Sequence, residues 1–446
     1  MKTRVLSLSI ALLFAFGTQL KAQESQPQEG RSGWTFGVLP SVSFDADLGF
    51  QFGALTNIYY FGDGSTYPDY IHSFYAEAAY TTRRYGVFRL SYDSKYLIPG
   101  YRTSVDVAYL PDAMCDFYGF NGYQTAYHSD WTDDASATYL TRAYYKMKRD
   151  LFKLNIDIQH NIAGNWYWNG GIGLFNYTID RVDFEMLNKG KDDDKQLPDV
   201  PTLYDKYLVN GLISADEANG GFHPYVHGGL TFDTRDRQQN PRKGIHADAF
   251  LTYTGAFGDQ SEFNNLRFNA AWRQYLPIID RKLIFAYRLG TQLLLAGQST
   301  FYQNTYMNQL YNQRVLYEGL GGGNSLRGIM RNRILADGFA YANIEMRIQL
   351  FKFKIKKENF YIGINPFMDG GMVLQERKFE NEIFTPDLAP EIDLDADNHA
   401  LHLSAGCGLK VAMNDNFVLS VDWATPLDKQ DNGKLSNLYI KMGYMF

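Results

Sequence analysis

Apolar and polar residues alternate with a period of two along most of the chain, in segments of roughly ten residues separated by turn residues. Such segments are typical of β-strands with one apolar and one polar face. Sixteen can be delimited: 48–61, 71–81, 86–96, 102–110, 137–148, 151–162, 166–181, 223–234, 244–257, 263–276, 282–295, 337–351, 359–374, 399–412, 416–425 and 437–446. The pattern predicts an all-β chain with an even number of antiparallel strands.

The segment 437–446 shows most clearly what the two faces are for. Its apolar face carries Leu438, Ile440, Met442, Tyr444 and Phe446. Lys441 and Gly443 point the other way, as expected for a strand with lipid outside and a polar lumen inside. After residue 22 there is no run of ~18 or more apolar residues, which excludes helical spans. We therefore predict a transmembrane antiparallel β-barrel of about 16 strands.

The lengths of the connections suggest how the barrel is oriented. With the N-terminus in the periplasm, the connections at 62–70, 182–222, 296–336, 375–398 and 426–436 become extracellular. Long loops outside and short turns inside are the usual asymmetry of such barrels. One long stretch, 111–136, falls on the periplasmic side and does not fit this scheme.

The residues before 48 are predicted to lie outside the barrel. Lys2 and Arg4, the apolar run from Val5 to Phe16 and the small residue Ala22 indicate a secretory signal peptide over 1–22. Trp34–Ser43 also alternates and could be a further strand. Because of the even count and the acidic residues that follow, we interpret 23–47 as a short periplasmic lead-in and 48–446 as the barrel.

Composition agrees with a barrel and excludes one class of partner. The chain is 45% hydrophobic, with 33 Tyr, 31 Phe and 40 Gly, yet its mean hydropathy is −0.33. This is expected where only every second strand residue faces lipid. The net charge of −6 and the scattered Lys and Arg residues do not support nucleic-acid binding. Cys115 and Cys407 are interpreted as free thiols.

A glycine-rich stretch, 319–328, stands out within the long connection 296–336. Glycine allows a tight backbone, so this extracellular loop could fold inward and place Arg327 in the lumen. A buried arginine needs carboxylate partners. On the neighbouring strands, the alternation places Glu345 and Asp369 on the lumenal face. We therefore predict a lumenal cluster of Arg327, Asp369 and Glu345.

Several short motifs resemble those of one family, the BamA/TamA outer-membrane assembly-factor superfamily, also called the bacterial surface antigen family. Ser325-Leu326-Arg327-Gly328-Ile329, after Gly322 and Gly323, is similar to its Val-Arg-Gly-Phe loop motif. Phe367-Met368-Asp369-Gly370-Gly371 is similar to its Phe-x-Asp-x-Gly strand motif. Asp233, Arg235 and Asp236, with Pro241 and Gly244, resemble its Asp-x-Arg-Asp turn, and Phe446 resembles its terminal aromatic.

The resemblance implies a non-enzymatic protein of the bacterial outer membrane that inserts or translocates proteins or lipids. It implies no cofactor, and its partners would be outer-membrane lipid, client outer-membrane proteins or a periplasmic protein. A mechanism in keeping with the family is lateral opening between the first and last strands, with the Arg327 loop bracing the barrel. Only residues 23–47 separate the signal from the barrel, so we expect a member without the family's periplasmic POTRA domains.

Other functions remain open at this point. A small-solute channel or receptor would use the same barrel lumen, and the Arg327 cluster could be structural or gating. A hydrolase finds less support, because Arg327 replaces the last glycine of a Gly-x-Ser-x-Gly elbow. His223 and His227 would lie roughly 13 Å apart on a strand, too far to share a metal. Asp393, Asp395 and Asp397 start like a calcium loop, but Asn398 replaces its glycine.

Overall fold

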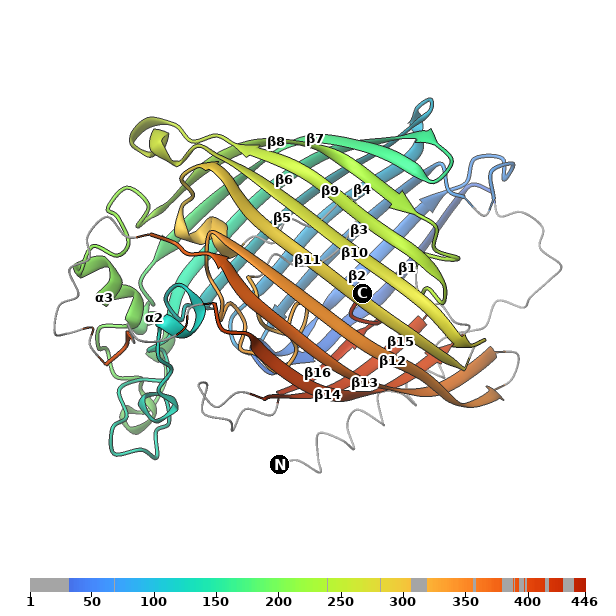
Figure 1. Cartoon of the computed structure of the whole chain (residues 1–446). Coiled ribbons are helices and arrows are strands. Elements are labelled where there is room, and N and C mark those ends of the chain that lie inside the picture. Colours follow the sequence, from blue (N-terminus) through green and yellow to red (C-terminus); the bar gives the residue numbers. More distant parts are fainter. Residues whose placement is uncertain are drawn as a thin grey trace.

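The computed structural model of the chain describes residues 32–67, 69–238, 240–280, 282–305, 319–355, 358–378, 388, 390–392, 397, 399–413, 417–427 and 437–446. The predicted signal peptide and the start of the predicted lead-in lie outside these residues. The described residues form sixteen antiparallel strands that close into one barrel in chain order, with β16 next to β1 (Figure 1). The predicted fold class is confirmed.

The strand bounds are β1 (Trp34–Asp45), β2 (Gly49–Tyr60), β3 (His72–Thr81), β4 (Gly86–Ile98), β5 (Tyr101–Asp116), β6 (Lys146–Ala163), β7 (Trp166–Asp180), β8 (Gly220–Asp233), β9 (Gly244–Thr254), β10 (Asn265–Ile279), β11 (Leu283–Gly297), β12 (Gly338–Ile355), β13 (Glu358–Gln375), β14 (His402–Met413), β15 (Phe417–Pro426) and β16 (Asn437–Met442). Two short helices, α2 (Phe184–Asn188) and α3 (Leu203–Val209), lie between β7 and β8. None of the described helices is long and apolar enough to cross a membrane.

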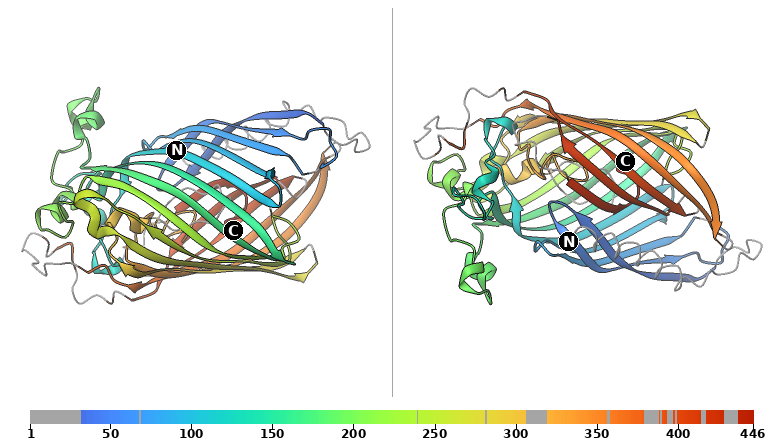
Figure 2. Two further views of the ribbon diagram at one scale, coloured as in Figure 1. Left: turned by 90° about the horizontal axis from the view of Figure 1, so that it is seen from above. Right: turned by 90° about the horizontal axis from the view of Figure 1, so that it is seen from below.

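Alternation along the strands sorts side chains between the outer surface and the lumen. On β8 and β9, Leu230 and Leu251 are exposed on the outside, whereas Thr231 and Asp248 are buried. The outer face is thus apolar and the inner face polar, as a barrel in lipid requires. The strands are strongly tilted in all views (Figures 1 and 2).

Two segments differ from the prediction, and their effects on the strand count cancel. Trp34–Asp45 is not a lead-in: it forms β1 and pairs with β2 along its whole length, from Trp34↔Tyr60 to Asp45↔Gly49. Residues 137–145 are not a strand, and the strand that begins at Lys146 continues through the segment predicted as 151–162. The barrel therefore begins at Trp34 rather than at residue 48.

The acidic residues after β1 form a tight turn rather than a break. Asp45 Oδ1 accepts hydrogen bonds from the backbone N–H groups of Asp47 (2.8 Å) and Leu48 (3.3 Å). An aspartate that bonds the backbone two residues further on favours a turn. The acidic pair thus joins two strands instead of separating a lead-in from the barrel.

The revised strand order also changes which connections share an end of the barrel. Connections that follow odd-numbered strands lie at one end, here called the loop end, on the left of Figure 1; the opposite end is the turn end. The described parts of the long connections 117–145, 181–219, 298–337 and 376–401 all lie at the loop end. The connection predicted at 62–70 on the side of the long loops follows β2, so its described residues lie at the turn end. The long stretch at 111–136 therefore no longer conflicts with an arrangement in which the long loops share one end of the barrel.

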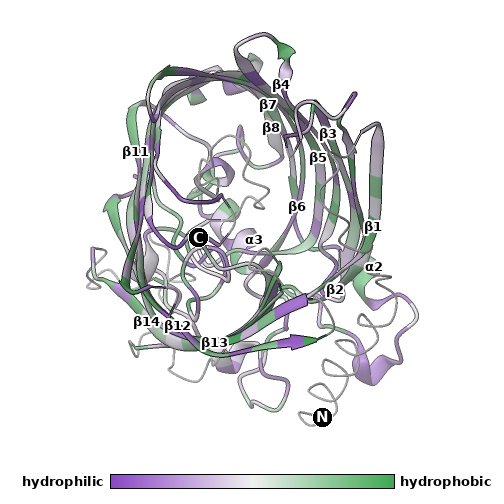
Figure 3. Ribbon diagram, turned by 90° about the vertical axis from the view of Figure 1, so that its right-hand side faces the viewer, coloured by the Kyte–Doolittle hydropathy of each residue, from purple (hydrophilic) through white to green (hydrophobic). Residues whose placement is uncertain are grey.

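Aromatic side chains join three of these connections into one packed layer. Phe117 lies 5.3 Å from Tyr207 and 5.9 Å from Phe301, measured between ring centroids, and Phe120 lies 5.4 Å from Tyr207. All four residues are buried. We call the described parts of 117–145, 181–219 and 298–305 the cap. Looking along the barrel from the turn end, α3 and loop segments lie across the lumen (Figure 3).

Two buried carboxylates tie the cap to the connection before β14. Glu391 accepts hydrogen bonds from the Tyr144 hydroxyl (2.5 Å) and from Lys206 Nζ. Glu217 accepts two bonds from Arg377 Nη2, at 2.7 and 2.8 Å. Buried carboxylates with charged partners hold segments in a defined arrangement, since losing one partner leaves the other charge uncompensated.

Candidate functional site

A folded segment of the β11–β12 connection, residues 319–336, lies inside the barrel and is called the plug here. Its backbone doubles back on itself, with Gly322 N–H donating to Ile329 O at 2.9 Å and a bridge between Leu320 and Ile334. Gly321 has φ of +118°, and a Cβ there would lie 2.0 Å from the Met330 carbonyl oxygen. Only glycine fits such a position.

Ser325 stabilises the turn of the plug. Its Oγ accepts from Gly321 N–H at 2.8 Å and donates to the carbonyl oxygen of Gly321 at 2.7 Å. Leu320, Leu326, Ile329 and Ile334 pack with Phe339 and Val373 into a small apolar core. Gly371 of β13 leaves room for this core, because a Cβ there would lie 2.8 Å from the side chains of Leu320 and Leu326.

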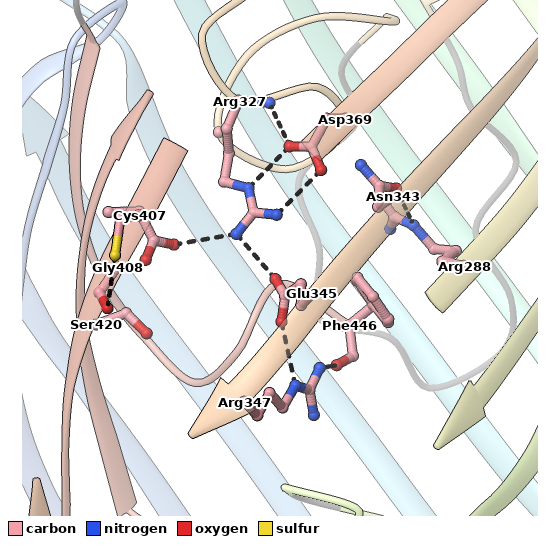
Figure 4. Close-up of polar contacts among 12 residues, drawn as sticks. Arg288, Arg327, Asn343, Glu345, Arg347, Asp369, Cys407, Gly408, Ser420 and Phe446 are labelled. Carbon is pink, nitrogen blue, oxygen red and sulfur yellow. Dashed lines mark hydrogen bonds and ion pairs between the residues drawn. The ribbon is translucent and has the colours of Figure 1, made fainter. Parts of the chain in front are cut away.

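The structure brings Arg327, Asp369 and Glu345 into one buried cluster (Figure 4). Arg327 donates from Nε to Asp369 Oδ2 (2.8 Å), from Nη2 to Asp369 Oδ1 (3.0 Å) and from Nη1 to Glu345 Oε1 (2.8 Å). Its backbone N–H also donates to Asp369 Oδ2 at 3.0 Å. The side chains of all three residues are 0% exposed. A bidentate pair of this kind fixes orientation as well as charge.

Two further residues complete the surroundings of the guanidinium. Arg327 Cζ lies 3.4 Å from the centroid of the Phe367 ring, which is a cation–π contact. Asp422 Oδ2 of β15 lies 3.5 Å from Arg327 Nη1, and its other oxygen accepts from Lys410 Nζ at 2.5 Å. Arg327 thereby anchors the plug to β12, β13 and β15, and Lys410 links Asp422 to β14.

Sequence reasoning did not include Asp422 in the cluster. It lies two residues after Ser420 on the same face of its strand, so its lumenal position could have been read from the alternation. The two lumenal residues Arg288 and Asn343 were also missed. Arg288 Nε donates to Asn343 Oδ1 at 2.8 Å, and Asn343 Nδ2 donates to the Ser325 carbonyl oxygen at 2.8 Å. Their contact with the plug depends on the path of a distant loop, which alternation does not encode.

The end of the chain differs from the prediction of a strand running to Phe446. β16 ends at Met442, and Gly443, with φ of +86°, turns the backbone away from the sheet. Tyr444 and Phe446 then contact Arg347 of β12, whose Cζ lies 4.1 Å and 5.3 Å from their ring centroids. We call Gly443–Phe446 the tail. The rings of Tyr444 and Phe446 therefore face lumenal arginines rather than lipid.

The plug also contacts both strands that meet at the closure of the barrel. Lys441 Nζ of β16 donates to the Gly323 carbonyl oxygen at 2.6 Å, and Gly328 N–H donates to the Tyr439 hydroxyl at 3.1 Å. A Cβ on Gly323 would lie 2.8 Å from Asp45 Oδ2 of β1. Glycine at 323 therefore allows the plug to approach β1 and β16 together.

A second arginine fixes the plug to the opposite wall. Arg331 Nη1 lies 2.9 Å from Asp112 Oδ2 and 3.6 Å from Asp116 Oδ2, both on β5. Arg333 donates to the carbonyl oxygens of Gly122 (2.7 Å) and Thr125 (2.9 Å) in the cap. The plug thus spans the lumen between the β12–β15 wall, the cap and β5.

The Asp-x-Arg-Asp turn lies apart from this cluster, between β8 and β9 at the turn end. Asp233 accepts from Arg235 Nε (2.9 Å) and Nη2 (2.7 Å). Asp236 Oδ1 accepts from the backbone N–H of Arg242 at 2.9 Å. Pro241 is buried in the turn, and Gly244, with φ of +104°, ends it where a Cβ would lie 2.3 Å from Thr234 O. These residues shape a local turn.

The other candidate sites find separate partners. His223 Nε2 is hydrogen-bonded to the Tyr302 hydroxyl at 2.8 Å, whereas His227 Nε2 lies 2.7 Å from Asp157 Oδ1. The described residues contain no group of three His, Cys, Asp or Glu side chains placed to hold a metal. Asp393 and Asp395 lie outside the described residues. Cys115 and Cys407 are both free thiols.

Comparisons with known proteins agree with this geometry. Residues 72–446 match a family described as the Omp85 superfamily domain. BamA from Haemophilus ducreyi lacking POTRA domains 1–3 has a similar structure, with a TM-score of 0.55 and 15% identity over 93% of this chain and 70% of that chain. CdiB from Escherichia coli gives a TM-score of 0.55 and 12% identity over 90% of this chain and 62% of that chain. At such identities the two structures show a shared fold. The comparison with curated proteins found no match.

Proposed function

The chain belongs to the Omp85 superfamily, and from this membership we propose that it inserts or translocates polypeptides or lipids at the bacterial outer membrane by opening laterally between β1 and β16. The family places it among outer-membrane assembly and translocation barrels, which are not enzymes. Because barrels of the outer membrane usually carry their long loops outside and their short turns inside, the loop end faces outward and the turn end faces the periplasm.

The observation that carries the proposal is the short pairing between β1 and β16. In the described residues the two strands pair only at Phe44↔Ile440. On its other side, β16 pairs with β15 from Leu419↔Met442 to Ala424↔Asn437. Because strand pairing is held by backbone hydrogen bonds, this seam is the weakest junction in the barrel wall.

The tail accounts for the shortness of the seam. If residues 443–446 continued as a strand, the register set by Phe44↔Ile440 would place Phe446 opposite Val38. The turn at Gly443 instead sends the tail into the lumen. In the described residues, the part of β1 that precedes Phe44 therefore has no strand partner on this edge. A free edge offers backbone N–H and C=O groups to an incoming strand, which supports a route for client strands.

The plug supports a bracing role at this seam. It contacts Asp45 on β1, Tyr439 and Lys441 on β16, and through Arg327 the carboxylates of the adjacent wall. Separation of β1 from β16 would break contacts on one side of the plug while the Arg327 cluster keeps the other side fixed. The plug therefore favours the closed seam until it moves.

The cap favours lateral opening over a channel for small solutes. Its buried rings and the Glu391 and Glu217 contacts join the long connections at the loop end. A solute path along the lumen would require these contacts to separate, since packed interiors leave little free space. Lateral opening requires only the seam and the plug to change.

Disulfide locks across single strand junctions would test the proposal. In a chain with Cys115 and Cys407 replaced by alanine, Phe44→Cys with Ile440→Cys would lock the seam. Two controls share one cysteine each with the lock: Phe44→Cys with Phe50→Cys joins β1 to β2, and Val421→Cys with Ile440→Cys joins β15 to β16. The readout is the content of other outer-membrane proteins and of surface lipid, measured by mass spectrometry after depletion of the unmodified protein.

We expect the oxidised seam lock to fail to restore the envelope, with recovery on reduction, while both controls restore it. Equal restoration by the oxidised seam lock would refute lateral opening. If depletion of the protein leaves the proteins and lipids of the envelope unchanged but alters the uptake of a solute, this result would point to a channel.

A further inference from the structure

The hairpin formed by β12 and β13 extends past its neighbour at the turn end. β11 pairs with β12 only as far as Leu283↔Ile348, followed by one hydrogen bond from Gln349 N–H to Lys282 O at 2.8 Å. Beyond this point β12 continues to Ile355 and pairs with β13 alone. The described residues therefore leave the segment Leu350–Ile355 with one unpaired edge, here called the β12 edge.

The two faces of this segment differ in chemistry. Phe351 and Ile355 are 66% and 53% exposed, and Phe353 stacks on Phe360 of β13 with ring centroids 5.5 Å apart. Lys352 and Lys354 alternate with them and are exposed. Among the residues that the structure describes, neither lysine side chain has a hydrogen bond or an ion pair, unlike the paired charges that line the lumen.

The unpaired backbone and the two lysines indicate that this edge lies outside the hydrocarbon layer. An unpaired backbone edge within lipid would leave N–H and C=O groups without hydrogen bonds, because the hydrocarbon offers no partner for them. Two lysines without a counterion would also be costly there. The β12 edge must therefore meet water or the headgroup region, where an extended polypeptide can reach it.

A second hairpin at the same end shows what covers such an edge. β4 extends past β3, whose pairing ends at Ser73↔Asp93. Residues 69–71 of this chain lie against the extension: Ser94 Oγ donates to the Ile71 carbonyl oxygen at 2.6 Å, and Lys95 Nζ lies 3.1 Å from Asp69 Oδ2. The occupant of that edge is a segment with a carboxylate opposite the lysine.

We propose that the β12 edge binds an extended acidic segment of a separate polypeptide, which adds as a strand beside Leu350–Ile355 and directs its carboxylates to Lys352 and Lys354. The backbone edge supplies the hydrogen bonds, and the alternation of the hairpin selects a partner that alternates acidic and apolar residues. The inference rests on the proposed function only for the compartment, which is the periplasm.

A fluorescent peptide of alternating glutamate and valine would test the proposal by anisotropy. The full chain would be held in nanodiscs of phosphatidylcholine, which carries no net charge. The variant Lys352→Glu with Lys354→Glu should bind this peptide on the order of tenfold more weakly, since both ion pairs become repulsions. Lys95→Glu is the matched control, because this lysine belongs to the covered hairpin, and it should leave binding unchanged.

Two altered peptides separate edge pairing from simple charge attraction. A peptide with lysine in place of glutamate should prefer the double variant over the unmodified protein. A peptide methylated on all of its backbone nitrogens keeps its charge but loses its backbone donors on both edges, and it should fail to bind. A seam-locked protein should still bind the first peptide, so failure of lateral opening and failure of this site are distinguishable.

Three results would overturn the inference. Equal binding of the methylated peptide would exclude strand addition. An equal loss in Lys95→Glu would show that binding follows overall charge. The third result is that no peptide binds, while vesicles containing phosphatidylglycerol retain the double variant more weakly than the unmodified protein. This result would assign the lysines to lipid headgroups.

Discussion

Arg347 of β12 donates a hydrogen bond from Nη2 to the main-chain carbonyl oxygen of Phe446 at 2.6 Å, and so holds the tail in the lumen. Its Nε atom donates to Glu345 Oε2 at 3.1 Å, and the other oxygen of Glu345 accepts from Arg327. A chain of charge-assisted hydrogen bonds thus connects the plug with the segment that follows β16. Movement of the plug and of the tail should be coupled through Glu345.

Replacing Arg347 should release the tail. In Arg347→Met the carbonyl of Phe446 and the ring of Tyr444 lose their contact with the guanidinium, so deuterium uptake at residues 443–446 should rise. Arg273→Met is the matched control: it removes another buried lumenal arginine, which contacts Asp248 and His246. Uptake that is unchanged in Arg347→Met, or raised equally in both variants, would show that Arg347 does not hold the tail.

Removing the Arg327 charge should weaken the plug strongly. Arg327→Met leaves Asp369 and Glu345 buried without their counterion, at a cost of ~3–5 kcal/mol in the free energy of unfolding measured with denaturant. Arg327→Lys should fall between this variant and the unmodified protein, because an ammonium group cannot form the bidentate pair. The triple variant Arg327→Met, Asp369→Asn, Glu345→Gln should recover part of the loss; no recovery would mean that charge is not the cause.

A side chain at Gly321 should disrupt the plug for a steric reason. Gly321→Ala places a Cβ 2.0 Å from the Met330 carbonyl oxygen, so the plug must rearrange and trypsin should cleave faster at Arg327 and Arg331. Gly258→Ala is the control, since Gly258 also has a positive φ, +65°, but has nothing within 4 Å of an added Cβ. Equal cleavage rates in the two variants would contradict a steric block.

The cap should lose stability at alkaline pH. Burial, the largest cause, raises the pKa of Tyr207 from 10.0 to about 12. The folded cap then retains a proton that the unfolded chain has lost, so the stabilisation is complete below pH 10 and decreases as the pH rises from about 10 to about 12. Ultraviolet absorbance of tyrosinate, followed together with proteolysis of the cap, measures this. Tyr207→Phe should reduce the pH dependence, whereas Tyr139→Phe, which alters a half-buried tyrosine of the cap, should leave it unchanged.

Alternation determined much of this protein by itself, because it is a local property. A strand between lipid and a polar lumen must alternate, so the all-β class, the barrel and most strand positions follow from the sequence. The lumenal faces of Glu345 and Asp369 follow in the same way. The glycine-rich stretch around Arg327 likewise points to a folded loop, since few other residues allow such a backbone.

Tertiary structure decided which alternating segments pair. Trp34–Asp45 and residues 137–148 both look like strands. The first pairs with β2 and β16, whereas 137–145 lie outside the sheet and only 146–148 belong to a strand, the start of β6. Pairing joins residues far apart in sequence, and a local pattern carries no record of it. The strand pairing also decides at which end of the barrel each loop lies.

The same reason limits the site. The distance of Asp422 from Arg327, the turn of the tail toward Arg347 and the contact of Gly323 with both seam strands depend on where separate segments meet in the closed lumen. Sequence indicated which residues face inward. The fold decided which of them share one buried space, where each charge must find its partner.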